Sequence, residues 1–396
     1  MKIVKLEDFS TYGGWENFSF LKITADEGIV GWAEFNEARG RKGLTGLIHS
    51  LGEGLIGEDP RNVARIDAML YGQTRSTTGG LQSHAMAAIV NACLDIKGKA
   101  LGVPVYELLG GAIRERLPVY WSHCGFFRAR YGALFDGKVI PSPAVRTLDD
   151  LRNVGREVCE RGFKALKTNL LMFDAQGVRA YSPGFGKGAG FPELNISDEI
   201  LDAFVLQLAA FREGAGPGVR MMMDLNFNYK PEGLRRLLKA AEPFNGMWLE
   251  MDLYEPQALS RVRQSTTTPI ASLETIFGRR SLRPYLENHA VDVAIIDVQW
   301  NGMLEALRMA SMADAFEVNV ASHCSSGPLS TLISSHFCCA IPNFRIMEVD
   351  VDEVPWRSTL LTKPYTIANG EFHLPTGPGW GADIDEEVVR AHPAKN

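Results

Sequence analysis

Residues 220–226, RMMMDLN, form a short apolar run that ends in two polar residues, Asp224 and Asn226. Six other runs of this kind occur after about residue 120, and stretches suited to helices separate them. They are FKALKTN (163–169), MWLEMD (247–252), PIASLE (269–274), VDVAIID (291–297), EVNVASH (317–323) and RIMEV (345–349). Strands that alternate with helices are typical of a parallel sheet, and about seven such units favour a closed α/β barrel.

The residues at the ends of these runs are ionisable and evenly spaced. From Asp224 onward they follow one another at intervals of 23 to 26 residues, about one strand–helix unit. In a barrel the C-terminal ends of successive strands meet at one mouth, so these side chains are expected to converge. A single charged strand end is weak evidence, whereas six in register predict an active site. The six are Asp224, Glu250, Glu274, Asp297, His323 and Glu348.

The first three of the six, Asp224, Glu250 and Glu274, place carboxylates on three consecutive strands. An all-oxygen site favours Mg²⁺ or Mn²⁺ over zinc, which prefers histidine and cysteine. Such a cation stabilises the negative charge that develops when the proton next to a substrate carboxylate is removed. We therefore expect one Mg²⁺ per subunit, with Mn²⁺ as the alternative.

The next two strands end in Asp297 and His323. A carboxylate beside an imidazole fixes its tautomer, which suits a general base. Side chains alternate along a strand, so Lys167 and Asn169 share one face and Lys164 points the other way. Lys167 is expected to supply positive charge to the substrate carboxylate or to act as a second base. His123, near the expected domain junction, is a candidate for substrate contact.

The segment before the barrel has a different pattern. FSFLKITADEGIVGWAEF (18–35) alternates around a turn and predicts a β-hairpin, and residues 59–109 have helical spacing that stops at Gly110-Gly111. The loop-rich segment from about Thr362 is expected to return to this first domain.

Composition narrows the class of protein. The 396 residues are 45% hydrophobic and 22% charged, with a net charge of −6, which argues against nucleic acid or an anionic membrane as a partner. No apolar run approaches the roughly 20 residues needed to cross a bilayer, and the first residues do not resemble a secretion signal. The six cysteines form no CxxC pair, so we expect reduced thiols in a cytoplasmic protein, with Cys338 and Cys339 in a buried helix.

Taken together, these motifs resemble the enolase superfamily, in particular its mandelate racemase-like subgroup. GIVGWAE (28–34) and LDIKGKALGVPVYELLGG (94–111) are similar to its capping-domain segments. The barrel runs, from GFKALKTN (162–169) to IPNFRIMEV (341–349), are similar to its strands two to eight. The resemblance implies a modified TIM barrel, (β/α)₇β, with an α+β capping domain built from the N-terminal segment and the C-terminal tail. The expected divisions are 1–120 for the cap, 121–360 for the barrel and 361–396 for the returning tail.

The resemblance also implies roles for individual residues. Asp224, Glu250 and Glu274 match the metal ligands, and Asp297 with His323 matches the base dyad. Glu348 matches the acid that hydrogen-bonds a substrate carboxylate oxygen, and Lys167 matches the first lysine of a KxK motif. A small-molecule carboxylate substrate and a homo-oligomer are expected by the same resemblance.

One departure from the family pattern bears on the reaction. Racemases of this subgroup have a second lysine where this chain has Asn169. Racemisation by two bases needs one on each face of the α-carbon, whereas a single histidine can remove the α-proton and then protonate a departing β-hydroxyl. Asn169 therefore favours a hydro-lyase, a dehydratase that converts an aldonate or aldarate to a 2-keto-3-deoxy acid. The alternative is a racemase, epimerase or cycloisomerase on the same scaffold, which Lys167 as second base would restore.

Further residues are candidates for substrate contact. The segment 171–197 contains glycines but no GxxxxGK[ST] motif, so we interpret it as a mobile lid rather than a phosphate loop. In 126–146, Arg128 and Arg130 are available to an anionic substrate. A metal-dependent hydrolase of another barrel family is disfavoured because no HxH motif follows an early strand. The remaining candidates for substrate contact are Asn169, Asn226, Trp15, Arg39 and Trp300.

Overall fold

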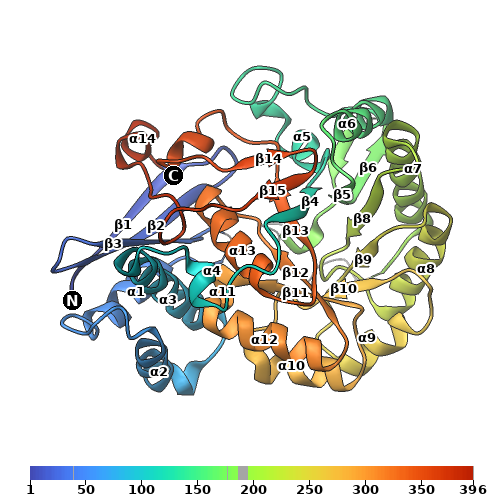
Figure 1. Ribbon diagram of the computed structural model, residues 1–396. Coiled ribbons are helices and arrows are strands. Elements are labelled where there is room, and N and C mark those ends of the chain that lie inside the picture. The colour runs from blue at the N-terminus through green and yellow to red at the C-terminus, as the bar shows by residue number, and fades with distance from the viewer. Residues whose placement is uncertain (39, 176, 186–194, 396) are drawn as a thin grey trace.

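The computed structural model describes residues 1–38, 40–175, 177–185 and 195–395. The chain forms a barrel and a smaller cap that lie side by side, and both termini lie on the cap (Figure 1).

Eight parallel strands form the barrel. Their order is β4-β5-β8-β9-β10-β11-β12-β13, and pairing between β13 and β4 closes the ring. The predicted strand runs all fall in this barrel. The strands are β4 (Arg116–Ser122), β5 (Ala165–Asn169), β8 (Arg220–Asp224), β9 (Trp248–Glu250), β10 (Ile270–Ser272), β11 (Val293–Asp297), β12 (Asn319–His323) and β13 (Phe344–Asp350).

Helices follow the first seven strands and surround them in Figure 1. No α-helix follows β13 before the chain turns back in the described residues, so the predicted (β/α)₇β architecture is confirmed. The helices are α5 (Phe126–Arg130), α6 (Leu148–Glu160), α7 (Asp198–Ala215), α8 (Pro231–Ala241), α9 (Pro256–Arg263), α10 (Gly278–Glu287), α11 (Val298–Asn301), α12 (Met303–Ala315) and α13 (Pro328–Ala340).

A layer of apolar side chains fills the barrel interior, and every strand contributes to it. Because side chains alternate along a strand, this layer shows which residues of each strand point inward. The layer consists of Tyr120, Ala165, Met222, Trp248, Ala271, Val293, Ile295, Ala321 and Ile346.

The cap combines an antiparallel sheet with helices. The sheet order is β1 (Ile3–Tyr12), β2 (Asn17–Ala25), β3 (Val30–Phe35), which confirms the predicted hairpin. The helices are α1 (Leu44–Glu53), α2 (Val63–Thr74), α3 (Gly80–Leu101) and α4 (Val105–Leu108). Helix α3 lies so close to β3 that a Cβ atom at Gly31 would overlap the carbonyl oxygen of Ala92.

Two contacts join the cap to the catalytic end of the barrel. Asn91 of α3 donates to the carbonyl oxygen of Val298 and accepts from the amide of Met303, at 3.2 and 2.9 Å. Glu34 of β3 accepts from the amides of Gly327 and Ser330, at the start of α13. The cap therefore holds the segments that follow Asp297 and His323.

The C-terminal segment reaches both domains. Strand β15 (Glu371–His373) pairs antiparallel with β4, and β14 (Thr366–Ala368) extends this hairpin. The chain then returns to the cap, where the Trp380 indole donates to the carbonyl oxygen of Trp32 and the tail ends beside β1. Strand β4 spans the expected boundary at residue 120.

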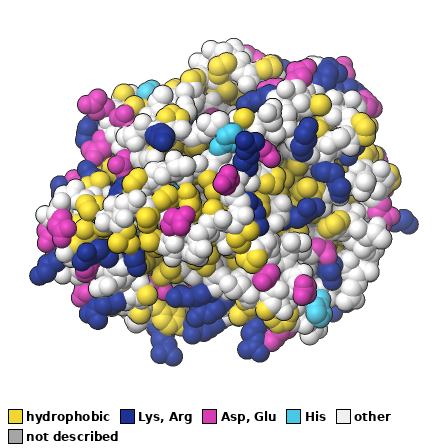
Figure 2. Space-filling view, in the orientation of Figure 1, with side chains coloured by type: hydrophobic (Ala, Val, Ile, Leu, Met, Phe, Trp, Pro, Cys, Tyr) yellow, Lys and Arg dark blue, Asp and Glu magenta, His cyan; other side chains and the backbone are white. Residues whose placement is uncertain are grey.

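The segment after β5 contains a two-stranded hairpin of β6 (Leu171–Asp174) and β7 (Gly177–Ala180). Residues 176 and 186–194 of the predicted lid lie outside the described residues. All six cysteines are free, and Cys338 and Cys339 are buried in α13 as predicted. None of the described helices has the length and apolarity to cross a membrane. Figure 2 shows Lys and Arg side chains among Asp and Glu side chains, with apolar side chains between them.

Candidate active site

The predicted strand-end residues form the layer directly above the apolar one. Each lies two positions after an inward-facing residue of its own strand, so its side chain also points inward. Most of these side chains are nearly inaccessible to solvent. The set is Lys167, Asn169, Asp224, Glu250, Asp297, His323 and Glu348.

Glu274 reaches the mouth by a different route. Alternation along β10 would place Leu273 in this layer, but Leu273 has φ of 92°, which is rare for a residue with a branched side chain. Asp252 supports this conformation, because its carboxylate accepts from the Leu273 amide at 3.0 Å and from the Ser272 hydroxyl at 2.9 Å. The turn brings Glu274 within 3.5 Å of His323, measured from Oε2 to Nε2.

Lys167 is buried between two carboxylates. Its Nζ lies 3.0 Å from Glu250 Oε2 and 3.0 Å from Glu348 Oε1. Burial alone would lower the pKa of Lys167, but the charges of Glu250 and Glu348 raise it well above its ordinary value. Lys167 is therefore a fixed cation in this structure.

Glu348 accepts a hydrogen bond on each of its carboxylate oxygens. The Ser122 hydroxyl donates to Oε1 at 2.5 Å, and the Cys324 amide donates to Oε2 at 2.6 Å. Burial favours the neutral form, but Lys167, then His323, lower the pKa of Glu348 well below its ordinary range. An ionised Glu348 can accept but not donate, so in this state it orients Lys167.

Asp297 and His323 form the predicted dyad. His323 Nδ1 lies 2.5 Å from Asp297 Oδ2, and Asp297 Oδ1 accepts from the amides of Gln299 and Trp300. Burial lowers the pKa of His323, but the charges of Glu274 and Asp297 outweigh it and raise the pKa to about 10. The imidazole is thus fixed at Nδ1 and directs Nε2 toward the carboxylates.

The three predicted metal ligands line the same mouth. Within the described ranges, no three acidic, histidine or cysteine side chains are close enough together to hold a metal ion. Glu250 is paired with Lys167, Glu274 lies beside His323, and Asp224 Oδ1 accepts from the Asn226 amide at 2.8 Å.

The chemistry of the set nevertheless fits a divalent cation. Five buried or largely buried carboxylates face two cationic groups, Lys167 and His323. Burial raises the pKa of Glu250 and Glu274, and the charge of Asp224 raises both further. An oxygen-only set with excess negative charge suits Mg²⁺.

The candidate substrate-contact residues lie at different distances from this centre. Asn169 donates to the carbonyl oxygen of Asp224, and its buried Oδ1 has no partner among the described residues. Asn226 bonds Asp224, and the Trp300 ring lies 4.7 Å from the His323 ring. The Trp15 ring lies 4.6 Å from the Phe127 ring and is tilted by 44° to it. Arg39 lies outside the described residues.

Arg128 is not available to a substrate, contrary to the prediction. It is buried and paired with Asp352 and Glu157, each at 2.8 Å. Sequence reasoning also missed Asp252 and Ser122, which position Glu274 and Glu348. The sequence does contain a signal for Asp252. It lies two residues after Glu250, so both side chains are expected on the same face of the strand.

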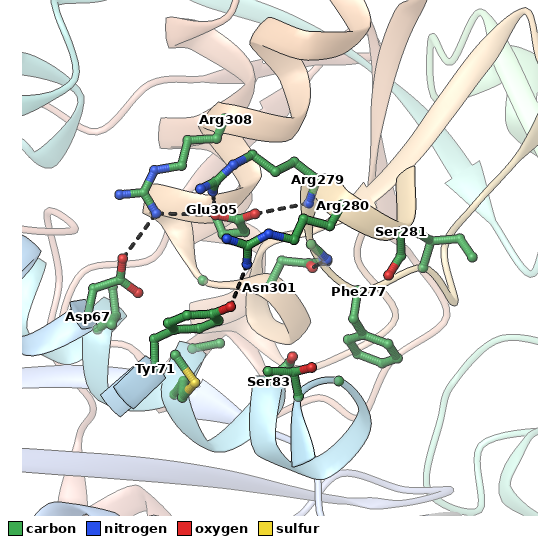
Figure 3. Close-up of a pocket in the computed structure, with 18 of the residues that line it drawn as sticks. Asp67, Tyr71, Ser83, Phe277, Arg279, Arg280, Ser281, Asn301, Glu305 and Arg308 are labelled. Atoms are coloured by element: carbon green, nitrogen blue, oxygen red, sulfur yellow. Dashed lines mark hydrogen bonds and ion pairs between the residues drawn. The ribbon is translucent and has the colours of Figure 1, made fainter. Parts of the chain in front are cut away.

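A separate cavity of about 660 Å³ lies beside the mouth, between α2 and α3 of the cap and α10 and α12 of the barrel (Figure 3). Its charged groups pair with one another, for example Arg308 with Asp67 and Glu305. Phe277 lines this cavity and stacks on Trp300, which contacts His323, so aromatic rings separate the cavity from the dyad.

Two family models match the chain. The enolase C-terminal domain-like model matches residues 150–388, and the mandelate racemase / muconate lactonizing enzyme N-terminal domain matches residues 11–110. The first covers more than half of the chain. The protein therefore belongs to the mandelate racemase / muconate lactonizing enzyme family of the enolase superfamily.

Individual relatives differ in their named activities. A D-galactonate dehydratase of Xanthomonas euvesicatoria pv. vesicatoria (strain 85-10) is 28% identical, over 98% of this chain and 94% of the relative. A crystal structure of a protein provisionally named L-alanine-DL-glutamate epimerase, from Burkholderia xenovorans strain LB400, contains magnesium and fumarate. It is 43% identical, with a TM-score of 0.95, over 100% of this chain and 96% of that chain. A protein provisionally named a dehydratase, from Salmonella enterica subsp. enterica serovar Typhimurium, is 28% identical, with a TM-score of 0.87, over 100% and 99% of the two chains.

Proposed function

We propose that this protein is a magnesium-dependent acid-sugar dehydratase, a hydro-lyase that converts an aldonate or aldarate to a 2-keto-3-deoxy acid. The observation that carries the proposal is the asymmetry of the mouth. One face has the His323–Asp297 dyad, whereas the position of a second base on β5 holds Asn169, and Lys167 is fixed between two carboxylates. The full-length similarity to D-galactonate dehydratases supports the same reaction.

The residues of the site have different roles in this reaction. His323, as the neutral imidazole, removes the proton α to the substrate carboxylate and, once protonated, assists departure of the β-hydroxyl. Asp297 holds the imidazole tautomer that this requires. A cation held by Glu274 would offset the carboxylate charge that raises the pKa of His323, and so would favour the neutral form. Lys167, oriented by Glu348, places positive charge beside the substrate carboxylate. Asn169, whose Oδ1 has no partner among the described residues, and Asn226 would bond substrate hydroxyl groups.

The metal is proposed on the same residues. Asp224, Glu250 and Glu274 would hold one Mg²⁺ per subunit, or Mn²⁺, which supplies positive charge where the enediolate accumulates negative charge. Cytoplasmic location and a homo-oligomeric state remain part of the proposal.

A second candidate is an epimerase or racemase. It is favoured by the 43% identity to the Burkholderia protein that carries an epimerase name. Under this candidate, Lys167 would have to lose its proton to become the second base, which its two ion pairs oppose.

A panel of aldonic and aldaric acids, incubated with the protein and Mg²⁺, tests the proposal. We expect at least one member to yield a 2-keto-3-deoxy acid. An isomerised acid with no keto product from any member would instead establish the epimerase.

A further inference from the structure

A second imidazole–carboxylate pair stands at the mouth of the barrel. His123 follows the last residue of β4, and Asp350 ends β13, where it pairs in register with Ser122. His123 Nδ1 lies 2.7 Å from Asp350 Oδ1, with side chains 14% and 5% exposed. Asp350 lies two residues beyond inward-facing Glu348, so it shares that face of β13.

Several contacts fix the His123 ring. The ring stacks on Phe127 at 4.1 Å with an interplanar angle of 7°, and Phe127 in turn contacts Trp15 of the cap. The backbone of His123 has φ of 47°, and the next amide, Cys124, donates to the carbonyl oxygen of Lys167 at 2.9 Å. A left-handed residue held by this many contacts is typical of a functional position.

The pair is not needed to close the barrel. Strands β13 and β4 already pair along four residues of each strand, from Met347 with Val119 to Asp350 with Ser122. With Nδ1 directed at Asp350, Nε2 points away from it, and no described residue bonds Nε2. An oriented imidazole with a free nitrogen is what an acid–base group requires.

His123 and His323 flank the same carboxylate. Glu348 lies on β13, His323 on the preceding strand, and His123 after the following one. Neighbouring strands are about 4.8 Å apart, so two strands place the backbones of His323 and His123 roughly 10 Å apart. A substrate bound between the two strands could therefore meet one histidine from each side.

We propose that His123, held by Asp350, is a second acid–base residue that donates the proton with which the substrate's β-hydroxyl leaves as water. This inference rests on the dehydratase function proposed above, and it assigns to His123 the proton donation to the leaving hydroxyl that His323 would otherwise perform. His323 takes the α-proton, and the electrons of that C–H bond pass to the carboxylate as an enediolate. They then form the C2–C3 double bond as the C3–O bond breaks. The hydroxyl leaves with the His123 proton as water. The enol becomes the 2-keto-3-deoxy acid, and both histidines return to their starting states by exchange with solvent.

The variant His123→Asn tests this role, because asparagine tolerates the left-handed backbone better than other residues. Three rates are measured with Mg²⁺ for wild type and variant. The substrate is D-galactonate or the panel acid that wild type dehydrates fastest. The first rate is its dehydration, the second is exchange of its α-proton in D₂O, and the third is fluoride release from its 3-deoxy-3-fluoro analogue. Fluoride leaves without a proton, so its release does not need the acid.

We expect His123→Asn to lower kcat for dehydration at least about 100-fold while α-exchange and fluoride release stay within about threefold of wild type. Asp350→Asn should lower dehydration alone by a smaller factor, and it serves as the second variant if His123→Asn does not fold. His49→Asn is the matched control, since His49 lies 2.7 Å from Asp8 in an exposed histidine–aspartate pair on the cap.

Equal losses of all three rates in folded protein, unchanged dehydration, or a rise in KM alone would each overturn the proposal. Failure of the dehydratase function itself looks different. Wild type would then exchange the α-proton and form the C2 epimer without releasing water.

Discussion

The cap and the barrel mouth each contain a largely buried cluster of charged side chains, and the two clusters differ in how their charge is balanced. In the cap, Asp95 accepts from the amides of Trp32 and Trp380, each at 2.9 Å, and from Lys99 at 2.6 Å. The cluster joins α3, β3 and the C-terminal tail, and its one buried carboxylate is paired with one partly buried cation, Lys99. In the mouth, the five carboxylates predicted from the sequence share two cations, Lys167 and His323, and Asn169 Oδ1 has no partner in the described part of the chain.

Burial alone therefore does not distinguish function from structure. Burial raises the pKa of Asp95 to about 6, against the opposing effect of Lys99, and burial also raises the pKa of Glu250. The two clusters differ in whether cations balance the buried carboxylates. Unbalanced buried negative charge destabilises a structural cluster, whereas a metal site needs it to bind the cation.

The sharpest contrast is expected from His323→Asn. We predict a fall in kcat of at least about 1,000-fold, because the only oriented base of the dyad is lost, with Mg²⁺ affinity near that of wild type. Kinetics and Mg²⁺ titration calorimetry measure these quantities, with exposed His289→Asn as control. Near wild-type turnover in His323→Asn would remove the assigned base.

The reverse pattern is expected from Asp95→Asn. Removing one partner of a buried ion pair costs roughly 3 to 5 kcal/mol of unfolding free energy. We expect about 3 kcal/mol here, because Lys99 keeps its ion pair with Asp383. Denaturation in urea measures this loss, and kcat of the folded enzyme should be unchanged. A large loss of kcat without loss of stability would mean that the cap cluster serves catalysis.

Glu250→Gln and removal of the metal test the proposed metal ligands of the mouth. We expect Mg²⁺ affinity to fall roughly 100-fold, since affinity follows the number of charged ligands, and chelation by EDTA to abolish turnover of wild type until Mg²⁺ is restored. Exposed Glu232→Gln should bind Mg²⁺ like wild type. Unchanged affinity in Glu250→Gln would exclude Glu250 as a ligand.

The smallest effect concerns the link between the two regions. Burial raises the pKa of Glu34 from 4.5 to about 7, despite hydrogen bonds from Ser330 and Gly327. A raised folded pKa means that the contribution of Glu34 to stability is full below pH 4.5 and lost as pH rises through 7. Between pH 5 and 8, wild type should therefore lose on the order of 2 kcal/mol of unfolding free energy relative to Glu34→Gln. Parallel pH curves of the two proteins would refute this assignment.

Much of the barrel could be predicted because parallel strands buried on both faces appear in sequence as short apolar runs. The seven strand runs and the inward position of Lys167 and His323 follow from that pattern and from alternation. The first barrel strand, β4, was not identified, because RLPVYWS contains a proline and polar residues and pairs with the tail strand β15 as well as with the barrel.

The remaining features depend on contacts between distant segments. Glu274 lies in the mouth only because Leu273 adopts a left-handed conformation that Asp252 stabilises, and no glycine in the sequence signals it. His123 likewise turns toward Asp350 through its own left-handed backbone. The pairing of Lys167 with Glu348 joins strands far apart in sequence, so the state of Lys167 could not be decided from the KxN pattern alone.

The most direct test of the single-base account is the fate of D-galactonate, or of the panel acid that reacts fastest, incubated with wild type and Mg²⁺ in D₂O and followed by NMR. The account predicts a 2-keto-3-deoxy acid as the product, with no C2 epimer of the substrate at any time. Accumulation of an α-deuterated C2 epimer without the keto acid would contradict it and show that a second base acts opposite His323.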